Sequence, residues 1–319
     1  MTPDELVRPC PDDCERMRQD LIARDLPPVW SLDAAVARRL HREGVDATQA
    51  AWQPSLASMP VTVEDLPAAD GRVAMRRYLP SGPPRPDAAP SRVTLIWFHG
   101  GGWVLGDLET GHAAALSACA ATGWEVVSVD YRCAPVDRFP TAVHDAISAT
   151  TWLLDLDRRV VVGGDSAGGN LAGAVAFACG DHPGLVGQVL VYPAADPSMS
   201  RASIGEFTTG PWLTDRDMGW FYDQYLPDDA ARTDPRVDLL AAAAESGTSP
   251  VDAVVLTVGH DPLRDEGIAL AEALRARGGR VTALHAPELF HGVLTSAGLL
   301  PSGQARVDEL WATARQMFM

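Results

Sequence analysis

One pentapeptide, Gly164-Asp165-Ser166-Ala167-Gly168, constrains the fold of this chain more than any other stretch. An apolar, β-branched run at 159–163 precedes it and an alanine-rich run at 169–178 follows it, which predicts a buried strand, a tight turn and a helix. A G-x-S-x-G sequence in that context is typical of a nucleophile elbow, where small residues on either side of a strained serine let strand and helix approach closely. We therefore expect Ser166 Oγ to project above a sheet at a helix N-terminus, where the helix dipole favours negative charge.

The rest of the chain alternates between apolar strand patterns and helical patterns. The expected helices lie at 110–121, 141–154, 266–277 and 304–318, besides the one after Ser166. The expected strands are 61–66, 73–79, 93–98, 125–129, 159–163, 185–191, 251–258 and 281–286, with a turn at 68–71 and a proline-rich connection at 80–90. Such alternation predicts an α/β fold, with a mostly parallel central sheet and helices on both faces.

Two segments fall outside this alternation. Residues 1–55 are predicted to form two or three amphipathic helical pieces, broken at Pro27-Pro28 and around Gly44, and residues 195–232 form an aromatic-rich insertion. Together they are expected to cover the carboxyl ends of the strands, where open α/β sheets bind ligands. The alternative is that the aromatic side chains only pack a helical insertion against the core. The predicted parts are N-terminal cap helices at 1–55, a first core part at 56–194, a cap insertion at 195–232 and a second core part at 233–319.

A serine hydroxyl is a weak nucleophile near neutral pH, so Ser166 needs a base and an orienting acid. In enzymes built on such an elbow the acid follows the serine and the histidine follows the acid. Asp261 comes directly after the strand predicted at 251–258, and His291 comes after the strand predicted at 281–286. Both should therefore lie at the same edge of the sheet as Ser166, and we predict that the three form a catalytic triad.

Other residues compete for these roles. His285 lies inside a predicted strand, which favours a structural role, and His260 comes too early in the order to be the base. Asp265 is expected on the following helix, and Asp165 is expected to brace the elbow.

Three consecutive glycines follow the strand predicted at 93–98, in the sequence His99-Gly100-Gly101-Gly102-Trp103. Without side chains, their backbone N–H groups can point into a site, so Gly101 and Gly102, with Ala167, are the expected oxyanion-hole donors. A phosphate-binding loop is the alternative, but neither a G-x-x-x-x-G-K-[ST] sequence nor a dinucleotide-binding G-x-G-x-x-G pattern is present.

Composition excludes several function classes. The net charge of −16 argues against nucleic acid and anionic membrane as partners. All 26 Lys/Arg-type residues are arginine, which removes Schiff-base and Ser-Lys chemistry. The five cysteines show no zinc-site spacing, so we expect no metal and no cofactor. Residues 1–24 are acidic and polar, unlike a signal peptide, and no run of 18 apolar residues occurs, so the expected location is cytoplasmic.

Over residues 90–318 the chain resembles the bacterial hormone-sensitive-lipase-like carboxylesterases of the α/β-hydrolase superfamily. The resemblance depends on motifs in a fixed order: His99-Gly100-Gly101-Gly102-Trp103, Asp130-Tyr131-Arg132-Cys133-Ala134-Pro135, Phe139-Pro140, Gly164-Asp165-Ser166-Ala167-Gly168-Gly169-Asn170-Leu171-Ala172, Asp261-Pro262-Leu263-Arg264-Asp265-Glu266-Gly267 and His291-Gly292. It implies an α/β-hydrolase fold with a helical cap, and the triad Ser166, Asp261 and His291. It is also compatible with a homodimer, which no feature of the sequence itself indicates.

The expected activity is hydrolysis of small acyl esters through an acyl-serine intermediate. Bulky residues in the expected cap and beside the glycine loop favour short acyl chains over triglycerides. The same residues would serve an amidase, a lactonase or a deacetylase, and the resembled family also contains non-catalytic small-molecule receptors. The residues expected to bind substrate are Trp103, Trp212, Trp220 and Val293.

Overall fold

The apolar runs of the sequence form a central sheet in the computed structural model, which describes residues 2–68, 73–81 and 93–319. Its order is β1-β2-β4-β3-β5-β6-β7-β8; β1 and β2 pair antiparallel, β2 pairs antiparallel with β4, and the others pair parallel. The strands are β1 (Val61–Leu66), β2 (Met75–Pro80), β3 (Val93–Phe98), β4 (Glu125–Val129), β5 (Arg159–Asp165), β6 (Leu185–Val191), β7 (Ala253–His260) and β8 (Val281–Phe290). The α/β fold class expected from the sequence is confirmed.

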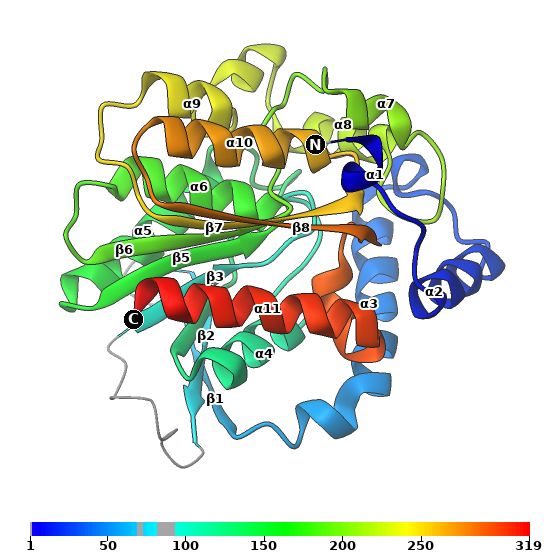
Figure 1. Cartoon of the computed structure of the whole chain (residues 1–319), viewed down its shortest axis with the longest axis horizontal. Coiled ribbons are helices and arrows are strands. Elements are labelled where there is room, and N and C mark those ends of the chain that lie inside the picture. Colours follow the sequence, from blue (N-terminus) through cyan, green and yellow to red (C-terminus); the bar gives the residue numbers. More distant parts are fainter. Residues whose placement is uncertain (1, 69–72, 82–92) are drawn as a thin grey trace.

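Helices cover both faces of this sheet (Figure 1). One face carries α4 (His112–Thr122) and α11 (Pro301–Phe318). The other carries α5 (Thr141–Asp155), α6 (Ala167–Cys179), α10 (Arg264–Ala276) and α9 (Leu239–Glu245), which packs on α6 and α10.

The central strand β3 shows why the sheet needs two covered faces. Successive side chains of a strand point to opposite faces. Leu95 and Trp97 therefore join the core under α4 and α11, whereas Ile96 and Phe98 join the core under α5, α6 and α10. All four are fully buried, as the continuous apolar run predicts for a central parallel strand.

The N-terminal segment contains α1 (Pro3–Leu6), α2 (Asp12–Ala23), the 3₁₀ turn η1 (Val29–Ser31) and α3 (Ala34–Leu56). The break expected at Pro27-Pro28 occurs between α2 and η1. The break expected around Gly44 is wrong, because α3 runs through it without interruption. A helix-interior glycine costs only about 1 kcal/mol relative to alanine. The packing of α3 against the body of the protein, where Ala37 and Trp52 are buried, offsets that cost.

The insertion consists of α7 (Ala202–Glu206), α8 (Asp215–Tyr225) and the 3₁₀ turn η2 (Asp229–Thr233). Its two ends are held together on α6, because Asn170 Nδ2 donates to Ala194 O at 3.0 Å and to Val237 O at 2.8 Å. On its other side, Glu266 Oε1 accepts a hydrogen bond from Ala195 N at 2.7 Å. The insertion therefore begins and ends beside the carboxyl end of β6.

Element boundaries differ from the expectations mainly near the carboxyl ends of the last strands. β8 extends to Phe290, because His260 pairs with Phe290 beyond an irregularity in the β7–β8 register. The helix α9 was not expected. The turn at 68–71 and the proline-rich connection at 80–90 fall largely outside the described residues. Among the residues that the structure describes, no helix has both the length and the apolar character needed to cross a bilayer.

Candidate active site

Ser166 occupies a sharp turn between β5 and α6. Its φ of 56° and ψ of −120° place it in a region that non-glycine residues rarely adopt. Strand and helix approach closely at this turn. A Cβ on Gly168 would lie 1.9 Å from Phe98 O, and a Cβ on Gly164 would lie 2.3 Å from Gly168 O. The two glycines thus let strand and helix approach as the motif predicts, and Ser166 heads α6.

The structure brings Ser166, His291 and Asp261 into one row. His291 Nε2 lies 2.9 Å from Ser166 Oγ, and His291 Nδ1 lies 2.9 Å from Asp261 Oδ2. The second contact is within ion-pair distance, although the ring N–H is not aligned for a well-formed hydrogen bond to Oδ2. Asp261 is held in place by the N–H of Leu263, which donates to its Oδ1 at 2.8 Å.

The strand ends explain why residues so far apart in the chain meet here. Asp261 follows the last residue of β7, and His291 follows the last residue of β8, so both loops leave the same carboxyl edge of the sheet as the turn after β5. Asp261 is completely buried and Ser166 is 8 % exposed. Water has little access to the row in this conformation.

Tyr192 supports His291 and was missed from the sequence. Its ring centroid lies 4.6 Å from that of His291, and its hydroxyl accepts a hydrogen bond from Leu294 N at 3.3 Å. Tyr192 directly follows β6. That position at a strand end is a signal that could have found it, by the reasoning applied to Asp261 and His291.

The glycine loop after β3 packs against the elbow, since a Cβ on Gly168 would meet the carbonyl oxygens of Phe98 and His99. No described residue accepts a hydrogen bond from the N–H of Gly101, Gly102 or Ala167. The φ angles of Gly101 and Gly102 are 117° and 60°, in the left-handed region that favours glycine. These three N–H groups are therefore available to a ligand oxygen.

Asp165 joins the glycine loop to the elbow. Its Oδ1 accepts a hydrogen bond from Gly100 N at 3.0 Å, which is the bracing role expected for it. Burial raises the pKa of Asp165 to about 6, against the opposing effects of His291 and of the Gly100 hydrogen bond. Asp165 thus holds the first glycine of the loop against the elbow.

His99 is a buried, neutral side chain at the start of the same loop. Burial lowers the pKa of His99 to about 4. Its Nδ1 donates to Gly100 O at 2.8 Å, its ring stacks on Tyr131 at 4.3 Å, and the Tyr131 hydroxyl donates to His99 O at 2.7 Å. His99 therefore shapes the loop and makes neither a hydrogen bond nor a ring contact with Ser166.

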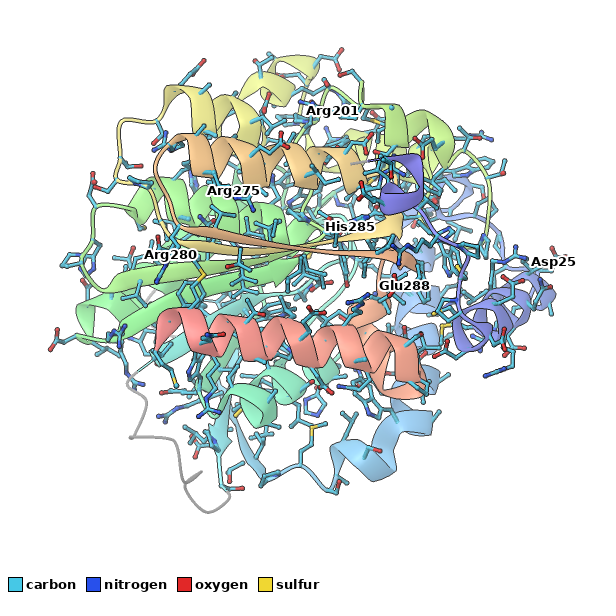
Figure 2. All side chains as sticks on the ribbon, viewed as in Figure 1. Asp25, Arg201, Arg275, Arg280, His285 and Glu288 are labelled. Atoms are coloured by element: carbon cyan, nitrogen blue, oxygen red, sulfur yellow. The ribbon has the colours of Figure 1, made fainter. Side chains whose placement is uncertain are left out.

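The competing histidines are used elsewhere. His285 lies on β8 (Figure 2), where Nδ1 lies 2.8 Å from Thr257 Oγ1 and Nε2 lies 2.9 Å from Leu6 O. His260 Nε2 lies 2.7 Å from Arg8 O. Asp265 is on α10, as expected, and its Oδ2 accepts a hydrogen bond from Ser203 N of α7.

The four residues expected to bind substrate lie in different surroundings. Trp103 is fully buried and stacks on Tyr225 of α8 with centroids 4.6 Å apart, and Val293 is fully buried at the start of a 3₁₀ turn, η3 (Val293–Thr295). Trp212 stacks on Phe290, the neighbour of His291, at 4.5 Å. Trp220 packs edge-on against Phe221 at 5.2 Å.

Phe221, which sequence reasoning missed, packs against the glycine loop. A Cβ on Gly102 would lie 2.1 Å from the Phe221 ring, so this α8 side chain packs directly on the backbone of Gly102. The insertion thereby reaches the loop that carries the free N–H groups. Its location in an aromatic-rich insertion was the only available signal.

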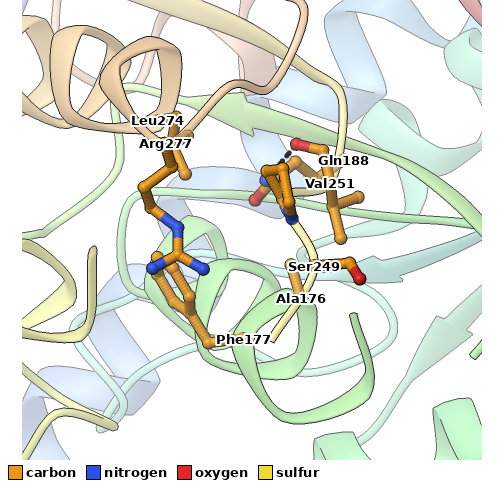
Figure 3. Close-up of a pocket in the computed structure, with 8 residues that line it drawn as sticks. Ala176, Phe177, Gln188, Ser249, Val251, Leu274 and Arg277 are labelled. Atoms are coloured by element: carbon orange, nitrogen blue, oxygen red, sulfur yellow. Dashed lines mark hydrogen bonds between the residues drawn. The ribbon is translucent and has the colours of Figure 1, made fainter. Parts of the chain in front are cut away.

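A separate small pocket lies between α6, α10 and the start of β7 (Figure 3), at the opposite end of the strands from Ser166. Arg277 crosses it, stacked over Phe177. Its guanidinium donates to the carbonyls of Ala243, Ser246 and Thr248, so Arg277 joins these segments structurally. Within the described part of the chain, no group of three or more His, Cys, Asp or Glu side chains could hold a metal ion.

Known proteins resemble this chain in sequence and in architecture. Residues 95–295 match a family model described as alpha/beta hydrolase fold. The chain is 39 % identical over 298 residues to the carboxylic ester hydrolase LipN of Mycobacterium tuberculosis, covering 89 % of this chain and 76 % of LipN. It is 33 % identical over 286 residues to an ethyl acetate hydrolase of Pseudomonas putida, and the match covers 86 % of this chain and 87 % of that hydrolase. The solved structure of a Pyrobaculum calidifontis esterase superposes on this chain with a TM-score of 0.83 at 31 % sequence identity. The superposition covers 97 % of this chain and 99 % of the esterase.

Proposed function

The chain belongs to the hormone-sensitive-lipase-like carboxylesterases of the α/β-hydrolase family, and from that premise we propose that it hydrolyses small acyl esters with Ser166, His291 and Asp261. The observation that carries the proposal is the row of these three side chains, in which His291 lies 2.9 Å from Ser166 Oγ and 2.9 Å from Asp261 Oδ2. The glycine loop that packs against the elbow supports it, because no described residue accepts a hydrogen bond from its Gly101 and Gly102 N–H groups. We also propose that 1–55 and 195–232 form the cap, and that 56–194 and 233–319 form the core.

The proposed reaction begins when Ser166 Oγ attacks the ester carbonyl carbon and passes its proton to His291 Nε2. The carbonyl electron pair moves onto the oxygen, which the N–H groups of Gly101, Gly102 and Ala167 stabilise. Collapse of this intermediate expels the alcohol, which takes the proton from His291 and leaves an acyl-Ser166. His291 then deprotonates a water molecule that attacks the acyl group, and return of the proton to Ser166 Oγ releases the acid. Asp261 stays ionised throughout and orients the ring.

Short acyl chains are the proposed substrates. Phe221 packs on Gly102, and Ser166 is 8 % exposed, which leaves little space beside the nucleophile. The likeness to an ethyl acetate hydrolase, a protein named for a two-carbon acyl group on a small alcohol, supports the same preference.

The first test is hydrolysis of p-nitrophenyl esters from acetate to decanoate by the wild type, Ser166→Ala and Ser58→Ala. Ser58 is an exposed serine and provides the matched control. We expect kcat/KM to be highest for short chains, to vanish in Ser166→Ala and to stay unchanged in Ser58→Ala, with equal melting temperatures. An active Ser166→Ala variant would place the nucleophile elsewhere, and a higher kcat/KM on octanoate or longer esters would reject the short-chain preference.

The amidase, lactonase, deacetylase and receptor alternatives share this site, so the same assay must separate them. Matched anilides and lactones, run beside the esters, should react more slowly than esters of the same acyl group. A faster reaction of the anilide or the lactone would reassign the substrate class. A well-folded wild type that neither hydrolyses any of them nor reacts with a fluorophosphonate at Ser166 would favour the receptor.

A cytoplasmic location and a homodimer are further parts of the proposal that only the sequence and the family resemblance support. No nucleic acid partner is proposed, since 42 acidic residues outnumber 26 basic ones.

A further inference from the structure

The loop that carries the proposed oxyanion donors is conformationally strained and needs restraint from outside. Gly101, Gly102, Trp103 and Gly106 all have positive φ, at 117°, 60°, 59° and 90°. For Trp103 such a backbone conformation is unfavourable, and it persists only where surrounding contacts determine it. Inside the loop, Val104 N and Leu105 N both donate to Gly101 O, at 3.1 and 2.7 Å, so the position of Val104 is coupled to that of Gly101.

Arg38 of α3 holds the far side of this loop. Its Nε donates to Val104 O at 2.6 Å, and its Nη2 donates to Ala134 O in the neighbouring segment. That segment is itself joined to the loop, since Ala134 N donates to Trp103 O at 2.9 Å. One guanidinium thus closes a ring of hydrogen bonds around Trp103, the residue with the unfavourable φ.

The same helix contacts the continuation of the loop one turn further along. Arg42 forms an ion pair with Asp107, whose Oδ1 accepts hydrogen bonds from Glu109 N and Thr110 N. Two turns beyond Arg42, Gln49 Nε2 donates to Glu109 O at 2.7 Å. The helix α3 therefore lies along residues 104–109 and contacts them through side chains on one of its faces.

The donors lie between two anchors. Asp165 holds Gly100 N from the core side, and Arg38 holds Val104 O from the side of the N-terminal helix. We propose that Arg38 is a positioning residue for the oxyanion hole: it fixes the Gly101 and Gly102 N–H groups in the geometry that stabilises the tetrahedral intermediate. The N-terminal helix would then contribute to the chemical step, besides covering the site. This inference rests on the proposed function.

Arg38 could act by positioning the loop, through its positive charge or by stabilising the fold, and these three roles predict different effects of its substitution. Lysine keeps the positive charge but cannot reach two carbonyls in a fixed fork, and alanine removes both charge and fork. Arg39, on the next position of α3, is 68 % exposed and pairs only with Glu43 among the described residues, so Arg39→Ala is the matched control. Because oxyanion stabilisation acts in the transition state, misplaced donors lower kcat more than they raise KM.

We expect Arg38→Ala to lower kcat by about 10- to 100-fold, less than the loss of a donor itself, with KM nearly unchanged. Arg38→Lys should show most of the same decrease in kcat, and Arg39→Ala should match the wild type. A short-chain trifluoromethyl ketone, which forms a tetrahedral adduct with the serine, should bind more weakly to Arg38→Ala by the factor lost in kcat/KM. Fluorine NMR of the adduct measures this binding and needs no turnover.

Several outcomes would overturn the inference. Arg38→Lys equal to the wild type would assign the effect to charge, and a raised KM at constant kcat would assign it to substrate binding. A lower melting temperature with unchanged kcat and ketone affinity would assign it to stability. Should Arg38→Ala not fold, Arg38→Lys and Arg38→Gln carry the same comparison. Absence of ester turnover in the wild type would instead reject the proposed function, and the ketone adduct would still test the position of the donors.

Discussion

At the scale of single residues, Asp261 carries the sharpest prediction. Its Oδ2 faces His291 Nδ1 and has no other partner among the described residues. We expect Asp261→Asn to lower kcat by about 10⁴-fold, because an amide in this place favours the wrong imidazole tautomer. Asp265→Asn is the matched control and should lose far less, since Asp265 contacts Ser203 and Arg264 and not the histidine. Steady-state kinetics that ranked the two variants the other way round would move the orienting role to Asp265.

His99 gives a pH-dependent prediction about stability. Burial lowers its pKa from 6.5 to about 4, so between these values the unfolded chain binds a proton that the folded protein does not. The contribution of His99 to the free energy of unfolding is therefore fully present above pH 6.5 and declines as the pH falls toward 4, by about 3 kcal/mol in all. Asp165 acts in the opposite direction, because burial raises its pKa to about 6 and its contribution grows as the pH falls.

The opposing effect of Asp165 makes the wild-type curve alone uninformative, so the test is a difference between proteins. Urea unfolding of the wild type and His99→Gln between about pH 4 and pH 7 should show a wild-type advantage that shrinks on acidification. His144→Gln, at an exposed position of α5, is the control for replacing a histidine by glutamine. A His99→Gln difference that does not change with pH would show that His99 titrates alike in both states.

At the scale of elements, two glycines predict opposite effects of the same substitution. A Cβ on Gly168 would meet Phe98 O at 1.9 Å, a backbone atom that cannot move without shifting β3 away from α6. A Cβ on Gly44, inside α3, would have no atom of another element within 4 Å. We expect Gly168→Ala to lower the free energy of unfolding by about 3 kcal/mol or more, and Gly44→Ala to raise it by about 0.5–1 kcal/mol. Urea unfolding measures both, and a Gly168→Ala protein as stable as the wild type would contradict the tight crossing at the elbow.

The elements that sequence predicted well are those with strong local patterns. The strands appear in the expected order because each is a short apolar run bounded by turn residues, and the motif around Ser166 placed the elbow. The helix α9 was missed because the alanine run at 241–244 shows no amphipathic pattern, and its start depends on the cap that Asp238 Oδ1 provides to Ala241 N. The expected break at Gly44 failed because the contacts of α3 with the body of the protein outweigh the low helix propensity of one glycine.

The same distinction between local patterns and long-range contacts applies to the site residues. Ser166, Asp261 and His291 could be named because each follows a predicted strand, and strand ends meet at one edge of a parallel sheet. Arg38 and Phe221 could not, because their contacts join segments that no local pattern relates. Arg38 meets a carbonyl 66 positions further along the chain, and Phe221 meets a glycine more than one hundred positions before it.

At the scale of the whole molecule, the proposed cap is assembled from two distant parts of the chain: an N-terminal segment and an insertion late in the core. The two parts touch where the Arg216 guanidinium of α8 lies 3.4 Å from the centre of the Trp30 ring in η1. Further along α8, Phe221 reaches the backbone of Gly102. We therefore expect that a weaker contact between Arg216 and Trp30 changes the space beside Gly102, where the acyl chain is proposed to lie.

We expect Arg216→Ala and Trp30→Ala each to widen the acyl-chain preference without impairing the chemical step. A cation–π contact between partly exposed groups contributes about 0.5–1 kcal/mol, so the ratio of kcat/KM for octanoate to that for acetate should rise about two- to fivefold in each variant. Because both changes remove the same contact, the double variant should rise no further than either single one. Arg16→Ala, at an exposed position of α2, is the control and should leave the ratio unchanged. A ratio that multiplied in the double variant would show that Arg216 and Trp30 act independently, and an unchanged ratio in both single variants would show that this contact does not limit the space above Ser166.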